Sequence, residues 1–217
     1  MIGSHGGQGR QGQSAGQDEL PPSASLRAYT LREAQYYLTV TSCRGCGKGP
    51  WLIESLAESD RPGEPTIIAG RCKACQAQGN FAFLCDYQLP GDGPQAELIN
   101  PTDRPSRIID LGQWLSLFYL LVESASSDES HTGTRKTGYQ AALCLAEALK
   151  FYGDGELPPE SAFFSETTAT AYRNHPEKFA RQKLRDIQAK LPALHRMAAR
   201  VDRDERQGRR RWWRFWQ

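Results

Sequence analysis

Residues 43–75 read CRGCGKGPWLIESLAESDRPGEPTIIAGRCKAC and contain two Cys-x-x-Cys pairs with 25 residues between them. A Cys-x-x-Cys turn lets two sulfurs approach one ion, and two such turns supply the four thiolates of a structural zinc site. The sequence therefore predicts one structural Zn²⁺ held by Cys43, Cys46, Cys72 and Cys75. A redox pair or a disulfide framework is the weaker alternative, because no βαβ pattern and no export signal accompany the cysteines.

The segments around the two pairs predict a small β unit. The stretch Tyr36-Tyr-Leu-Thr-Val-Thr41 is rich in β-branched and aromatic residues and runs into the first pair, which favours a strand. Residues 51–56, 66–70 and 80–87 are further strand candidates, with a turn-rich connection at 59–65.

Residues 36–87 resemble the zinc-ribbon group, in which two β-hairpins, each carrying a Cys-x-x-Cys knuckle, clamp one structural zinc. The resemblance implies a fold and a metal but not a task. The first pair is followed by Gly47, which suits a left-handed turn, whereas the second is followed by Gln76. Cys85 and Cys144 are interpreted as buried small apolar residues, with Cys85 as an extra metal ligand in the alternative.

Composition divides the chain into segments. The first helix is predicted to begin at Thr30-Leu-Arg-Glu33, which has the form of a capping box. Four prolines and two glycines between Leu89 and Ser106 indicate a boundary. The predicted organisation is a disordered Gly/Gln-rich leader at 1–24, a zinc-ribbon domain at 25–88, a Pro/Gly linker at 89–106, an α-helical domain at 107–205 and a basic aromatic tail at 206–217.

Apolar residues at three- and four-residue steps predict a helix over 108–122 and a second over 135–152, joined by a polar loop at 124–134 into an antiparallel hairpin. A seam from Ala180 to Val201 follows at heptad-like spacing and is interrupted by Pro192, which predicts a kink or two abutting helices. Packing of this seam on the hairpin is favoured over a self-associating coil. The fold class is α+β: a small antiparallel zinc-ribbon β unit followed by an α-helical hairpin and C-terminal helices.

Charge is distributed unevenly along the chain. Residues 1–167 carry 13 Lys and Arg against 20 Asp and Glu, whereas residues 168–217 carry 14 against 5. The last twelve residues, RQGRRRWWRFWQ, contain no acid. Arginine pairs with phosphate and tryptophan stacks on bases, so these positions predict a nucleic-acid contact: Arg209, Arg210, Arg211, Trp212, Trp213, Arg214, Phe215 and Trp216.

The chain contains no recognisable catalytic motif, and none of its four histidines belongs to a catalytic arrangement. The longest apolar run, at 114–122, is shorter than a membrane span requires. The sequence favours a cytoplasmic, non-enzymatic, zinc-stabilised protein that binds nucleic acid through its basic C-terminal helices and tail. The alternatives are a protein-interaction adaptor whose tail packs on its own core or oligomer interface, and a peripheral protein whose tail binds an anionic membrane.

Overall fold

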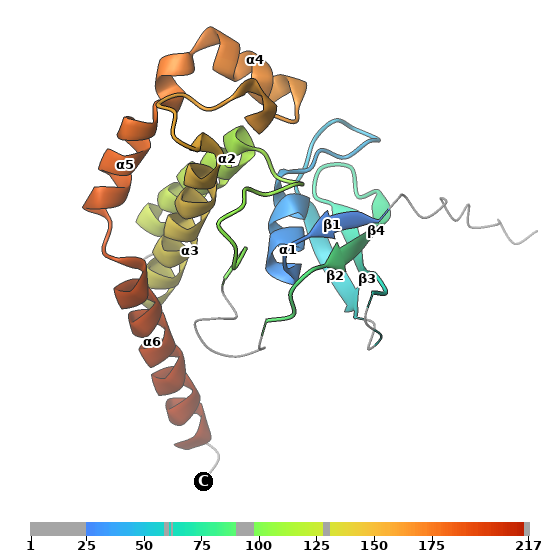
Figure 1. Cartoon of the computed structure of the whole chain (residues 1–217). Coiled ribbons are helices and arrows are strands. Elements are labelled where there is room, and N and C mark those ends of the chain that lie inside the picture. The colour runs from blue at the N-terminus through green and yellow to red at the C-terminus, as the bar shows by residue number, and fades with distance from the viewer. Residues whose placement is uncertain (1–24, 59–60, 62, 90–97, 128–130, 215–217) are drawn as a thin grey trace, which may run out of the picture.

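The computed structural model describes residues 25–58, 61, 63–89, 98–127 and 131–214, without the side chains of 131–132, 205 and 207–214. The predicted leader, 1–24, and part of the predicted linker, 90–97, lie outside the described residues. A small sheet and a larger group of helices stand side by side (Figure 1). This arrangement confirms the α+β class.

The four strands form one mixed sheet in the order β1-β4-β3-β2. Strands β2, β3 and β4 are antiparallel neighbours, as the sequence predicts, while β1 pairs in parallel with β4 and makes the sheet mixed. A register shift between Ile53 and Ser55 leaves Glu54 as an extra residue in edge strand β2. The strand bounds are β1 Leu26–Ala28, β2 Trp51–Ala57, β3 Thr66–Cys72 and β4 Gln78–Cys85.

Helix α1 (Leu31–Val40) occupies the segment predicted to be a strand, and that prediction is wrong. The predicted capping box does start it: the Thr30 hydroxyl accepts the Glu33 N–H at 3.2 Å, and the Glu33 carboxylate accepts the Tyr29 N–H at 2.5 Å. Ala34 and Leu38, four residues apart, are completely buried against the sheet. This helical burial outweighs the β propensity of the tyrosines and threonines that surround it.

The predicted helical hairpin is formed by α2 (Leu111–Ser127) and α3 (His131–Leu149). The predicted polar loop, 124–134, is too long, because both helices continue into it. Ser126 and Ser127 donate their hydroxyls back to the carbonyls of Val122 and Glu123, each at 2.9 Å, so these polar residues are compatible with the last turn of α2.

The C-terminal segment forms three α-helices and short 3₁₀ turns around the hairpin. Pro192 lies between α5 and α6, which confirms the predicted break in the seam. Leu184 and Val201 from that seam are buried in the helical core. The bounds are η2 Lys150–Tyr152, η3 Glu160–Ala162, α4 Glu166–Asn174, η4 Pro176–Phe179, α5 Arg181–Lys190 and α6 Leu194–Arg214.

Asp110 ties the start of α2 to the start of α4. Its Oδ1 accepts the Gln113 N–H at 2.8 Å, and the Gln113 side chain accepts the Asp110 N–H at 2.9 Å. Its Oδ2 accepts the backbone N–H groups that precede α4 at 3.0 and 3.2 Å and the Thr168 hydroxyl at 2.6 Å. Because the carboxylate is completely buried, these donors provide the compensation that its burial requires.

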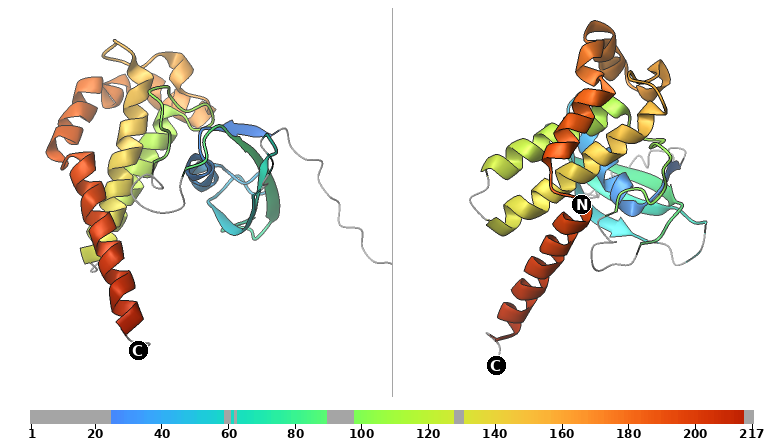
Figure 2. Two further views of the ribbon diagram at one scale, coloured as in Figure 1. Left: turned by 60° about the horizontal axis from the view of Figure 1, so that its bottom comes forward. Right: turned by 60° about the vertical axis from the view of Figure 1, so that its left-hand side comes forward.

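The sheet and the helical unit meet across α1 (Figure 2). One side of α1 packs on the sheet, where the Tyr37 ring lies 5.8 Å from that of Phe83. The Tyr36 ring, on the other side, lies 5.9 Å from that of Trp114, which is completely buried in α2. Helix α1 therefore belongs to both cores.

A buried polar layer lies at the same junction. Glu33 of α1 is 0% exposed and Glu147 of α3 is 5% exposed. The ammonium group of Lys150 binds Glu147 Oε1 at 2.7 Å and the carbonyl of Asn100 at 3.0 Å. Glu33 Oε1 and Glu147 Oε2 have no hydrogen-bond partner among the described residues. Two buried carboxylates thus lie in the field of the Lys150 ammonium group, and the Arg107 guanidinium also acts on Glu33. Their burial is costly if both are ionised.

Candidate metal centre

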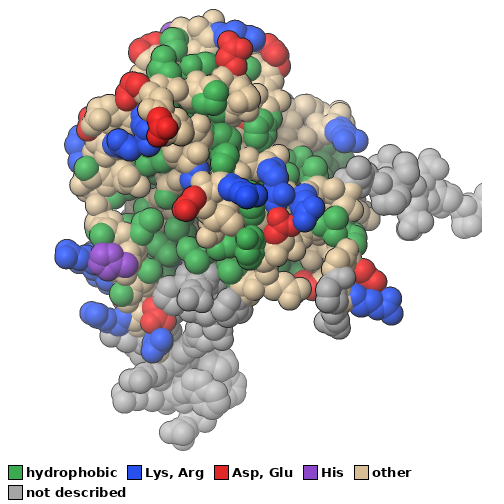
Figure 3. Space-filling view, viewed as in Figure 1, with side chains coloured by type: hydrophobic (Ala, Val, Ile, Leu, Met, Phe, Trp, Pro, Cys, Tyr) green, Lys and Arg blue, Asp and Glu red, His purple; other side chains and the backbone are tan. Residues whose placement is uncertain are grey.

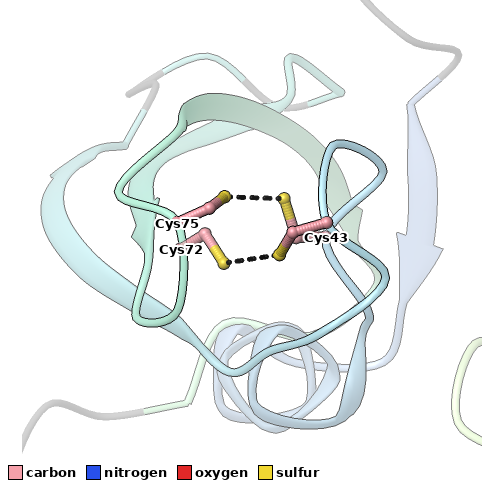
Figure 4. A group of neighbouring side chains, drawn as sticks. Cys43, Cys72 and Cys75 are labelled. Atoms are coloured by element: carbon pink, nitrogen blue, oxygen red, sulfur yellow. Dashed lines mark hydrogen bonds between the residues drawn. The ribbon is translucent and has the colours of Figure 1, made fainter.

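The four predicted ligands converge from two loops (Figure 4). Cys43 and Cys46 lie between α1 and β2, while Cys72 ends β3 and Cys75 lies in the turn to β4. The expectation that each pair sits in a β-hairpin holds for the second pair only. The first pair follows a helix, because the segment before it is α1 and not a strand.

The two loops have the same backbone geometry. The N–H of Cys43 donates to Lys48 and that of Cys72 to Ala77, at 2.5 and 2.8 Å, and each of these cysteines accepts an N–H from the residue four positions on. That residue has a left-handed conformation in both loops, with φ of 69° at Gly47 and 65° at Gln76. Both are therefore knuckles of one type.

Gln76 carries a left-handed conformation that glycine adopts more readily. Its side chain is fixed by two hydrogen bonds: its Oε1 accepts from Arg71 at 2.7 Å, and its Nε2 donates to the carbonyl of Lys73 at 3.0 Å. These bonds compensate for the strain, so the departure from glycine does not prevent the second knuckle from forming.

The spacing of the sulfurs fits a tetrahedral ion. The Sγ atoms of Cys43 and Cys75 are 3.7 Å apart, as are those of Cys46 and Cys72, and all four lie within 4.8 Å of one another. Four sulfurs placed about 2.3 Å from a zinc ion would be about 3.8 Å apart. A disulfide would bring two sulfurs to about 2.05 Å, so the thiols are in the geometry of ligands and not of a bonded pair.

Crowding makes the thiols electrostatically unequal. Backbone N–H donation from Cys75, with smaller contributions from other donors, lowers the pKa of Cys72 to about 7. At Cys75 the Ala77 N–H acts in the same direction, but the neighbouring thiols and burial raise its pKa to about 12. The Cys72 thiol therefore loses its proton more readily than an ordinary thiol, and the Cys75 thiol less readily. A bound cation would remove this difference, because its positive charge favours the thiolate form of all four cysteines.

Both knuckles carry exposed cations that are not among the predicted site residues. Arg44 and Lys73 each follow the first cysteine of their pair, and Lys48 follows the first knuckle. A zinc ion with four thiolates has a net charge of about −2. The positive charges of these side chains partly neutralise that negative charge. Their positions within two residues of a cysteine are the feature of the sequence that could have indicated them.

Cys85 and Cys144 lie outside the cluster. Cys144 is 0% exposed in the helical core, as predicted for a buried small apolar residue, whereas Cys85 is partly buried and packs beside the sheet core. The described residues therefore provide four thiols at this site and no fifth.

The second predicted site falls mostly outside what is described. The backbone of residues 206–214 belongs to α6, so the predicted tail begins as a continuation of a helix. The side chains of Arg209, Arg210, Arg211, Trp212, Trp213 and Arg214 and the whole of Phe215 and Trp216 lie outside the described residues. Their predicted contact with nucleic acid remains a prediction.

A row of described cations precedes that segment on α5 and α6. Lys and Arg side chains recur along the left edge of the molecule over these helices (Figure 3). We call six of them, all exposed, the basic face: Lys183, Arg185, Lys190, Arg196, Arg200 and Arg203.

The acids near the basic face have other partners. Asp202 binds Arg206, Asp204 binds Arg135 of α3, and Asp186 accepts from Gln182. Within the described residues, no member of the basic face forms an ion pair. Its charge is therefore available to an anion outside the protein.

Comparisons of the chain with protein-family models, curated proteins and solved structures find no match. The four-cysteine cluster is compatible with a zinc-ribbon-like site by its geometry alone. Among the described helices, none combines the length and apolar character needed to cross a membrane.

Proposed function

We propose that the chain is a non-enzymatic binding protein, stabilised by one structural Zn²⁺, that contacts nucleic acid through the basic face and the C-terminal segment. The observation that carries the proposal is the exposed, unpaired row formed by Arg196, Arg200 and Arg203. Steps of four and three residues put these arginines on one side of α6. A row of guanidinium groups without internal partners suits a row of phosphates.

The role proposed for the metal is structural. All four ligands are protein thiols, and a tetrahedral ion with four protein ligands has no coordination position left for a substrate. The sheet core has five buried apolar residues, a small number for a unit that must hold its own fold. Metal binding would supply the missing stability.

The described part of α6 favours nucleic acid over a membrane as the polyanion. Its apolar residues, among them Leu194 and Val201, pack against the helical core, while Arg196, Arg200 and Arg203 face outward. A helix that binds a membrane surface exposes an apolar face that enters the lipid. Among the described side chains of α6, the exposed ones are mostly charged, with the small residue Ala199 among them.

Binding of labelled oligonucleotides by the zinc-loaded full chain, followed by fluorescence polarisation at several salt concentrations, tests the proposal. The variant R196A/R200A/R203A should bind more weakly. Its slope of log affinity against log salt on a duplex should be flatter by up to about 0.9 for each lost contact.

A matched control removes three exposed arginines elsewhere, in the variant R61A/R104A/R173A. It has the same net charge as the first variant but keeps the basic face, so it should retain most of the affinity and the slope. Equal losses in the two variants would show that net charge alone is measured. Absence of binding by the unmodified chain at low salt would refute the proposal.

A protein-interaction adaptor is the second candidate function. Helix α2 exposes Tyr119, Leu120 and Val122 at 50%, 54% and 39%. Neighbouring apolar side chains that remain in water are a feature of surfaces that bind other proteins. If no oligonucleotide binds, this face of α2 becomes the leading site for a partner.

A further inference from the structure

We infer that the nucleic acid is duplex DNA and that the C-terminal half of α6 enters its major groove. The inference rests on the proposed function and goes beyond it by naming the ligand class and the mode of contact. It is carried by the way α6 is anchored and by where it extends.

Helix α6 has two halves with different surroundings. Its first half is anchored on α3: Leu194, Met197, Ala198 and Val201 pack against the helical core, and Arg135 binds Asp204 at 3.1 Å. Arg135 lies one turn from the start of α3 at His131, so the N-terminal end of α3 lies beside residue 204. The anchored half fixes the direction in which the helix leaves the body.

The second half projects beyond the hairpin. Figures 1 and 2 show α6 continuing past the ends of α2 and α3 in every view. The ten residues from 205 to 214 correspond to about 15 Å of helix at 1.5 Å per residue. Since the body leaves the backbone of this half accessible from several sides, it can insert into a groove, which a helix lying flat on the body cannot do.

The dimensions favour B-form DNA as the ligand. A helix with its side chains is about 10–12 Å across, and the major groove of B-DNA is about 12 Å wide and 8.5 Å deep. The major groove of an RNA duplex is too narrow for this entry, and a single strand has no groove.

Single strands are usually held on stacking platforms of exposed aromatic rings. The aromatic residues of the sheet are engaged inside the protein, since Trp51 packs on Phe81 with ring centres 4.9 Å apart and Phe83 packs on α1. The described strands therefore offer no such platform, so stacking on a single strand would rest on the predicted residues of the C-terminal segment, Trp212, Trp213, Phe215 and Trp216.

The sequence of the projecting half suits the groove. It reads ERQGRRRWWR, with five arginines and one acid. Gln207, Arg210 and Arg214 continue in sequence the four- and three-residue steps that relate Arg196, Arg200 and Arg203. Arginine is the residue that most often reads guanine in the major groove, through O6 and N7.

The test compares three ligands of equal length and related sequence: duplex DNA, duplex RNA and single-stranded DNA. The zinc-loaded full chain is expected to bind duplex DNA at least about tenfold more tightly than either of the others at moderate salt. Methylation of guanine N7, which blocks the major-groove edge, should weaken binding to the duplex.

Two substitutions at one position test the requirement for a helix. Gly208 lies in the projecting half. G208P should break the helix there and lose the preference for duplex DNA, whereas G208A favours the helix and should keep or strengthen it. Both variants should melt within a few degrees of the unmodified chain, because the position lies beyond the anchored half.

The outcomes separate the two proposals. Equal binding of the three ligands, or a G208P variant that keeps its preference for duplex DNA, would overturn the groove inference while leaving nucleic-acid binding in place. Failure of all three ligands to bind would overturn the proposed function itself. Preference for duplex DNA that G208P removes and G208A preserves would support both.

Discussion

Glu147 should limit the stability of the folded chain at alkaline pH, and glutamine at this position tests that expectation. Burial, partly offset by Lys150, raises the pKa of Glu147 from 4.5 to about 7. A raised pKa means that the folded state holds the proton more tightly than the unfolded state. The stabilisation is therefore complete below the unfolded value and is lost as the pH rises through about 7.

The magnitude follows from the two pKa values. Each unit of difference between the folded and unfolded pKa is worth about 1.4 kcal/mol of stability. Between about pH 5.5 and about pH 8, the folded chain loses the stabilisation that corresponds to nearly one and a half of these units. E147Q does not titrate and can still accept a hydrogen bond from Lys150. From the lower to the higher pH, the free energy of unfolding of E147Q should therefore rise by about 2 kcal/mol relative to that of the unmodified chain. This corresponds to about 4 to 8 °C in melting temperature.

Thermal unfolding of the two zinc-loaded proteins at both pH values measures the gain. The lower value stays near pH 5.5 because protonation of thiolate ligands at lower pH would release the metal. E123Q, which removes an exposed carboxylate of α2, controls for the loss of one charge and should show no comparable gain. If the difference between E147Q and the unmodified chain is the same at both values, Glu147 stays ionised throughout and the reasoning fails.

Three further substitutions, two of them paired with a control at another glycine, test local features by thermal unfolding. G47A should cost about 1 kcal/mol and weaken zinc retention against a chelator, because the residue has a φ of 69°, whereas G45A in the same knuckle should change little. G112A should cost about 1–3 kcal/mol, because the added Cβ would lie 2.7 Å from a threonine of α4. Its control is G138A, whose Cβ would have no atom closer than 4.0 Å and which should stabilise α3 by up to about 1 kcal/mol. D110A should cost about 2–4 kcal/mol because several buried donors lose their acceptor, and a cost below about 1 kcal/mol would contradict the role given to this carboxylate.

The clustering of Cys43, Cys46, Cys72 and Cys75 could be predicted from the sequence because it depends on the spacing within each pair. The same holds for the cap at Thr30 and the break at Pro192, which are set by residues within one turn of each other. The strands β2, β3 and β4 were also predictable, since short apolar runs between turn residues identify them.

The sequence predictions are wrong or incomplete where residues distant in the chain decide the local structure. Residues 36–41 have strand propensity, but Leu38 gains its burial on strands that follow it in the chain. The polar layer joins Glu33 to Glu147 across more than a hundred residues, and nothing near either position indicates the other. Glu33 was recognisable only as part of a capping box, so its burial beside a second carboxylate required the structure.

Helix α1 connects the metal centre to the rest of the molecule. Its last residue, Val40, is three positions before the first ligand, so a metal at the knuckles would restrain its C-terminal end. Its middle contacts both the sheet and Trp114 of α2, and its first turn carries Glu33 into the polar layer beside α3. Helix α3 in turn supports α5 and α6. A metal bound by the four cysteines would therefore contribute, through α1, α2 and α3, to the placement of the helices that carry the basic face.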